Sequence, residues 1–92
     1  MTHSFKDNPA RSRYELEEQG LIAWADYRVD GSRMYIDHVE SPVALRGAGT
    51  AGRLMQALVD DVRGKGLKVT PICSYAAVWL RRHPETRDLL AT

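Results

Sequence analysis

Three glycines within six residues separate an extended segment from an amphipathic one, and this feature constrains the fold more than any other. The loop reads Gly47-Ala48-Gly49-Thr50-Ala51-Gly52. Before it, the alternating segment 33–39 is typical of a β-strand. After it, apolar residues recur at spacings of three and four, which predicts an amphipathic helix: Ala51, Leu54, Met55, Leu58 and Val62. The chain therefore predicts a strand, a glycine-rich loop and a helix in succession.

Further strands are expected on both sides of this unit. Alternating apolar and polar residues predict strands from Arg13 onwards and over 21–29, antiparallel to segment 33–39. Asp30-Gly31 predicts a type I′ hairpin turn, because both central positions of that turn need a positive φ. Beyond the helix we expect a strand over 67–72, parallel to segment 33–39, and a short helix over 76–83. This order predicts an α+β fold.

Length, charge and cysteine content limit the class of protein. The 92 residues suit one domain, with residues 1–12 as a loose lead-in and residues 13–92 as the domain itself. A net charge of +1 gives no basis for nucleic acid as a partner, and no apolar run approaches the roughly 20 residues that cross a bilayer. The lone Cys73 cannot form an internal disulfide and no secretory leader is visible, so we expect a cytoplasmic protein.

Three kinds of phosphate-binding loop are compatible with the glycine pattern. As G-x-G-x-x-G it matches a dinucleotide fingerprint, but Thr70-Pro71 stands about where the ribose-binding acid is expected. As a P-loop it has Arg53-Leu54 in place of Lys followed by Ser or Thr. In the third interpretation, small residues let the backbone approach a diphosphate at the first turn of a helix. A structural turn with close helix packing is the alternative to all three.

Three ordered segments make the third interpretation more specific. Arg46-Gly47-Ala48-Gly49-Thr50-Ala51 fits the pattern Q/R-x-x-G-x-G/A. Ile36-Asp37-His38-Val39-Glu40 precedes it. The third segment follows it and consists of Pro71-Ile72-Cys73-Ser74-Tyr75 and then Arg81-Arg82-His83-Pro84. Together they resemble the GNAT superfamily of N-acetyltransferases, in particular its short, single-domain YjdJ-like branch. The chain has Val39, Thr50 and Ser74-Tyr75 where that branch more often has Thr, Ile and Pro-Phe.

The resemblance implies a reduced GNAT fold and an acyltransferase that moves an acetyl group from acetyl-coenzyme A to an amine of a small molecule or protein. It implies that the pantetheine and thioester meet main-chain groups at Val39 and Glu40. The diphosphate is expected on the main-chain amides of the loop: Arg46, Gly47, Ala48, Gly49, Thr50 and Ala51. The alternative is a non-catalytic module of the same fold that binds coenzyme A or a protein partner.

Two side chains are candidates for catalysis at the acetyl end. Cys73 follows a predicted strand and precedes a helix, whose terminal amides favour a reactive thiolate. Alternation places His38 on one face with Met34 and Ile36, and imidazole is the common general base near neutral pH. The resemblance places both near the thioester, Cys73 as acetyl carrier or pocket lining and His38 as base. A buried cysteine and a core histidine are the structural alternatives, and no ligand spacing predicts a metal site.

Overall fold

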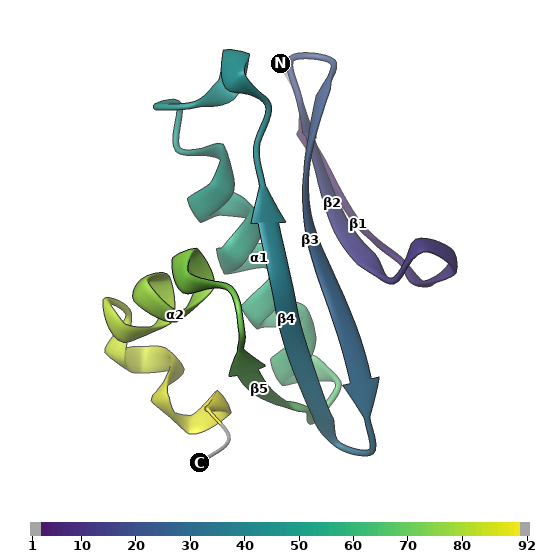
Figure 1. Ribbon diagram of the computed structural model, residues 1–92, viewed down its shortest axis with the longest axis vertical. Helices are drawn as coiled ribbons and strands as arrows, with labels where there is room; N and C mark the ends of the chain where they lie inside the picture. Colours follow the sequence, from purple (N-terminus) through teal and green to yellow (C-terminus); the bar gives the residue numbers. More distant parts are fainter. Residues whose placement is uncertain (1–2, 91–92) are drawn as a thin grey trace.

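Five strands form one mixed sheet in the computed structural model, which describes residues 3–90 (Figure 1). The first four strands are antiparallel, and β5 runs parallel to β4, which confirms the predicted crossover and the α+β class. The strands cross the sheet in chain order: β1 (His3–Asn8), β2 (Arg13–Glu18), β3 (Leu21–Asp30), β4 (Arg33–Glu40) and β5 (Lys68–Pro71).

Two α-helices and three single 3-10 segments complete the described chain: α1 (Thr50–Gly64), α2 (Ser74–Arg81), η1 (Pro9–Arg11), η2 (Val43–Leu45) and η3 (Pro84–Leu89). The long helix that the sequence predicts is α1, and it ends before Gly66, whose φ of 71° is left-handed. The shorter helix, α2, begins two residues earlier than predicted. No helix among residues 3–90 is long and apolar enough to cross a membrane.

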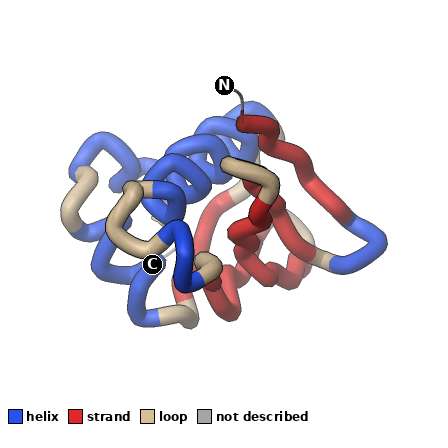
Figure 2. Tube along the Cα trace, turned by 90° about the horizontal axis from the view of Figure 1, so that it is seen from above, coloured by secondary structure: helices blue, strands red, loops and turns tan. Residues whose placement is uncertain are grey.

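One hydrophobic core lies between the sheet and the helices. α1 packs across β2 and β3, while α2 packs against β4, β5 and α1. In Figure 2 the helical segments gather on one side and the strands on the other, apart from the short η1. Every layer contributes fully or nearly fully buried side chains, among them Tyr14, Leu16, Met34, Ile36, Leu54, Leu58, Val62, Trp79 and Leu80.

The prediction that residues 1–12 form a loose lead-in is wrong for β1, because this strand pairs with β2 along its whole length. The Phe5 ring stacks on Tyr14, with ring centroids 5.3 Å apart. The Asp7 carboxylate accepts a hydrogen bond from the Lys65 ammonium at 2.9 Å. Tyr14 is in the next strand and Lys65 is 58 positions from Asp7, so a segment with few apolar residues gains its order from contacts that its own periodicity does not reveal.

The type I′ turn is at a different hairpin from the predicted one. Asp30 pairs with Arg33, so the two loop residues of the β3–β4 hairpin are Gly31 and Ser32, of which only Gly31 has a positive φ. In the β2–β3 hairpin, Gln19-Gly20 has positive φ at both positions, 55° and 75°. Two positive φ angles are what a type I′ turn requires.

A β-bulge interrupts the pairing of β3 with β4. Tyr27 is paired with Ile36, whereas Asp26 is paired with His38. Asp37 is therefore one additional residue in β4, and such a bulge bends the strand and changes which face the following side chains occupy.

The bulge makes the predicted placement of His38 wrong. Met34 and Ile36 are buried in the core, but His38 is exposed, with 54% of its side chain accessible. Val39, predicted on the opposite face from Ile36, instead packs against the core. Because strand side chains alternate with a period of two, a single inserted residue exchanges the two faces beyond it.

Candidate functional site

β4 is paired with β5 over only the first half of its length. β5 pairs with β4 from Lys68 to Pro71, opposite Arg33 to Ile36. The amides of Ile72 and Cys73 then both donate to the carbonyl oxygen of Ile36, at 2.9 and 3.0 Å, and the chain turns into α2. Among the described residues, no strand pairs with residues 37–40 on the β5 side. These residues form an open edge that an extended molecule can pair with.

The glycine loop presents backbone amides next to this open edge. Gly47 and Gly49 have φ angles of 85° and 83°, a conformation that residues with a Cβ rarely adopt. Gly49 is the N-cap of α1, so no side chain satisfies the amides of the first turn, and that turn contains no acidic residue. Free amides and the helix dipole together favour an anion at this end of α1.

A buried carboxylate, that of Glu18, is bonded to the first turn of α1. Glu18, at the end of β2, is only 7% exposed and accepts a hydrogen bond from the Thr50 hydroxyl at 2.6 Å. It also accepts two from the Arg53 guanidinium, at 2.6 and 2.7 Å, and Arg53 in turn donates to the carbonyl oxygen of Ala48 at 2.8 Å. The bond to Glu18 raises the pKa of Arg53. Glu18 therefore ties the first turn of α1 to the sheet, and Arg53 ties the loop to that turn.

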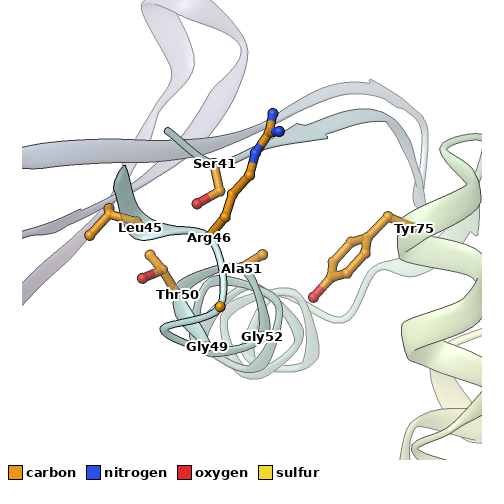
Figure 3. Close-up of a pocket in the computed structure, with 9 residues that line it drawn as sticks. Ser41, Leu45, Arg46, Gly49, Thr50, Ala51, Gly52 and Tyr75 are labelled. Carbon is orange, nitrogen blue, oxygen red and sulfur yellow. The ribbon is translucent and has the colours of Figure 1, made fainter. Parts of the chain in front are cut away.

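A hollow of about 440 Å³ lies in front of the loop (Figure 3). The loop side is formed by Arg46, Gly47, Gly49, Thr50, Ala51 and Gly52. Ser41, Leu45 and Tyr75 complete the wall, and Figure 3 shows the Tyr75 ring directed towards the start of α1. Of the residues predicted to bind the coenzyme, Ala48, Val39 and Glu40 do not line the hollow. The Thr50 side chain faces Glu18, so only its main chain can serve a ligand.

Comparison with known proteins assigns the family. The sequence model of the GCN5-related N-acetyltransferase family matches residues 13–89. The chain belongs to this family. Among solved structures, the NMR solution structure of a GCN5-like protein from Staphylococcus aureus has the same fold, with a TM-score of 0.69. The two sequences are 24% identical, and the match covers 96% of this chain and 87% of the other. No curated protein matches the chain.

In this N-acetyltransferase family member, the predicted base belongs to a small charged cluster. His38 Nε2 lies 2.9 Å from Glu40 Oε1, and Glu40 Oε2 lies 3.4 Å from Arg46 Nη2. The side chains of all three are at least one-third accessible to solvent. The cluster joins the open edge of β4 to Arg46, the residue before the glycine loop. Because its side chain is exposed, His38 is a surface residue rather than the core histidine of the structural alternative.

Cys73 lies at the point where β4 and β5 separate. It is the N-cap residue of α2, is partly buried, and packs against the core. Its amide is bonded to Ile36, two residues before His38 in β4, so both candidate residues belong to the same end of the paired strands. Cys73 does not line the hollow. Within residues 3–90, no three His, Cys, Asp or Glu side chains are grouped as metal ligands would be.

Tyr75 lines the hollow, although the sequence did not suggest it as a site residue. The one signal was that Ser74-Tyr75 stands where the related branch more often has Pro-Phe. Burial raises the pKa of the Tyr75 phenol, and the neighbouring Cys73 adds to the effect. The hydroxyl therefore stays protonated at neutral pH and can donate a hydrogen bond into the hollow. Ser41 is a second such residue, because its hydroxyl is buried and has no hydrogen-bond partner among the described residues.

Proposed function

We propose that this chain binds acetyl-coenzyme A through its diphosphate on the glycine loop and transfers the acetyl group to an amine. Membership of the N-acetyltransferase family supports the reaction class. The observation that carries the proposal is the start of α1. There, two left-handed glycines and an N-cap without a side chain leave the amides of the first turn open to a diphosphate. The residues present thus fit the phosphates in shape and in charge.

The open edge of β4 would hold the pantetheine arm. That arm is extended and carries amide groups, which suit hydrogen bonding to an unpaired strand. Val39 and Glu40, predicted from the resemblance, belong to the part of β4 that β5 leaves unpaired, where the main-chain groups of successive residues alternate between the β3 side and the free edge. A backbone amide directed at the thioester carbonyl would stabilise the negative charge that develops on its oxygen.

Two routes for the acetyl group are compatible with this placement. In direct transfer, the amine nitrogen attacks the thioester carbon, the carbon–sulfur bond breaks to release the coenzyme thiolate, and His38 accepts the amine proton. In the covalent route, the Cys73 thiolate attacks the thioester carbon, and the carbon–sulfur bond to the coenzyme breaks to release its thiolate. The amine then attacks the new thioester, its proton goes to His38, and the Cys73 thiolate leaves. Both routes end with the same acetylated amine and free coenzyme A.

Calorimetric titration with acetyl-coenzyme A tests binding, and release of free thiol with a panel of amines tests transfer. Inorganic pyrophosphate and ATP serve as controls for binding of any polyphosphate. We expect saturable binding of the coenzyme and thiol release that depends on the amine. Absence of binding at millimolar concentration would overturn the proposal. Binding without amine-dependent release would instead support the non-catalytic module.

A further inference from the structure

We propose that Glu18 and Arg53 are positioning residues for the diphosphate site, acting as a neutral brace behind the glycine loop rather than as ligands. This inference rests on the proposed function. Glu18 lies at the end of β2 and Arg53 in the first turn of α1, and their side chains meet through two hydrogen bonds of 2.6 and 2.7 Å. Neither residue lines the hollow.

The geometry explains how the brace shapes the loop. The same guanidinium nitrogen that bonds Glu18 also donates to the carbonyl oxygen of Ala48, between the two left-handed glycines. A Cβ added at Gly49 would lie 3.0 Å from Arg53 Nη1. Glycine at position 49 is thus favoured by its positive φ and allows the close approach of the Arg53 guanidinium. Arg53 contacts the loop through the Ala48 carbonyl and does not line the hollow, so the side of the loop that faces the hollow remains accessible to a ligand.

Charge is the second function of the brace. A buried carboxylate at the N-terminus of α1 would compete with a diphosphate for the positive end of the helix dipole. Arg53 removes this competition, because a paired carboxylate and guanidinium have no net charge. If Arg53 is replaced, the buried Glu18 carboxylate no longer has the guanidinium charge beside it. We expect this to weaken binding of an anion more than removing both charges does.

This difference gives a double-mutant test with acetyl-coenzyme A as the probe. We expect Arg53→Met to weaken binding by about tenfold. The double variant Glu18→Gln, Arg53→Met should bind about threefold more tightly than Arg53→Met alone, because the negative charge of Glu18 is also removed. The loss in Arg53→Met should shrink as salt is added. S-acetylpantetheine, which lacks the diphosphate, should bind all variants alike.

A matched control lies on the same helix. Arg63 forms an ion pair with the exposed Asp88 at 2.6 Å near the other end of α1, so Arg63→Met removes an arginine–carboxylate pair from the same helix, away from the loop. It should leave coenzyme affinity within about twofold of the parent. Arg53→Lys is the second test variant, since it keeps the charge but not the paired geometry of the guanidinium. If Arg53→Met fails to fold, Arg53→Lys takes its place, and we expect it to keep most of the parent's affinity for the coenzyme.

Amide hydrogen exchange in the free protein provides a readout that does not depend on the coenzyme. Arg53→Met should speed exchange across residues 47–52, and Arg63→Met should not. If the parent does not bind the coenzyme, the proposed function fails while the brace is judged by exchange alone. Equal exchange and affinity in Arg53→Met and the parent would overturn the brace. A double variant that binds no better than Arg53→Met would overturn the neutralising role.

Discussion

The amide nitrogen of Cys73 donates a hydrogen bond to the carbonyl oxygen of Ile36 over 3.0 Å. The lone cysteine of the chain is thereby fixed to the last residue of β4 that β5 pairs with. Beyond this point β4 continues to Glu40 with pairing to β3 on one side and no strand on the β5 side among the described residues. The thiol and the open backbone edge are therefore neighbours because of one main-chain bond, and the predictions begin with that thiol.

Cys73→Ser distinguishes the two routes of transfer. If Cys73 is an acetyl carrier, mixing the parent with acetyl-coenzyme A alone leaves one acetyl group on the protein, and the variant remains unmodified. Intact mass measures both. If Cys73 only lines the substrate path, neither protein is modified and Cys73→Ser keeps its turnover with an amine. A modified parent whose variant still turns over fully would show that the acetylation is a side reaction.

His38→Ala tests the general base. We expect turnover to fall by about a hundredfold, the lower range for loss of a positioned base, while coenzyme affinity changes little. Because half of the side chain is exposed, added imidazole should enter the space and restore part of the rate. Steady-state kinetics with and without imidazole measure this. Unchanged turnover would show that His38 is not the general base and only contacts Glu40 at the surface.

Substitutions at Gly49 separate backbone strain from charge. Gly49→Ala should cost about 1–2 kcal/mol of folding free energy, because a residue with a Cβ is strained at positive φ. Gly49→Asp adds a negative charge at the diphosphate site and should weaken coenzyme binding far more than Gly49→Ala does. Gly47→Ala is the control for strain alone, because a Cβ at Gly47 meets no atom within 4 Å.

Urea unfolding and calorimetry measure the two effects at Gly49 separately. A folded Gly49→Asp protein that binds coenzyme A as tightly as the parent would place the phosphate cradle elsewhere.

Asp61 should make stability depend on pH. Its carboxylate accepts hydrogen bonds from the Tyr14 hydroxyl at 2.6 Å and lies 2.8 Å from the Lys65 ammonium. Burial alone would raise the pKa of Asp61, but the bonds from Lys65 and Tyr14 outweigh it and lower the pKa. A group whose pKa is lower in the folded state stabilises the fold above its unfolded pKa, about 3.9 for Asp, and loses this effect as the pH falls through the folded value.

Asp61→Asn therefore should destabilise the protein by about 1–3 kcal/mol at pH 7, and by progressively less below about pH 4. Urea unfolding across this pH range measures the difference from the parent. Asp60→Asn is the matched control, since Asp60 is exposed and, within residues 3–90, its side chain accepts a hydrogen bond from Gln56 alone, at 3.3 Å. An equal loss for Asp61→Asn at pH 7 and pH 3 would show that the charge of Asp61 is not the cause.

The sequence by itself determined the features that depend on local periodicity and local dihedral angles. Spacings of three and four predicted α1, and the parallel placement of β5 followed from the strand-helix-strand order. Gly47 and Gly49 were recognisable because few other residues adopt their positive φ. The glycine loop and its position before a helix were thus predictable from neighbouring residues alone.

Tertiary structure alone decided the features that join distant parts of the chain. The bulge at Asp37 moved His38 to the surface, because pairing with β3 sets the register and the pattern within β4 does not reveal an added residue. Arg53 is not part of the apolar spacing that predicts α1, yet its side chain is bonded to Glu18, 35 positions earlier. Hydrogen bonds of this kind depend on where folding brings two side chains together, and no spacing along the sequence encodes that distance.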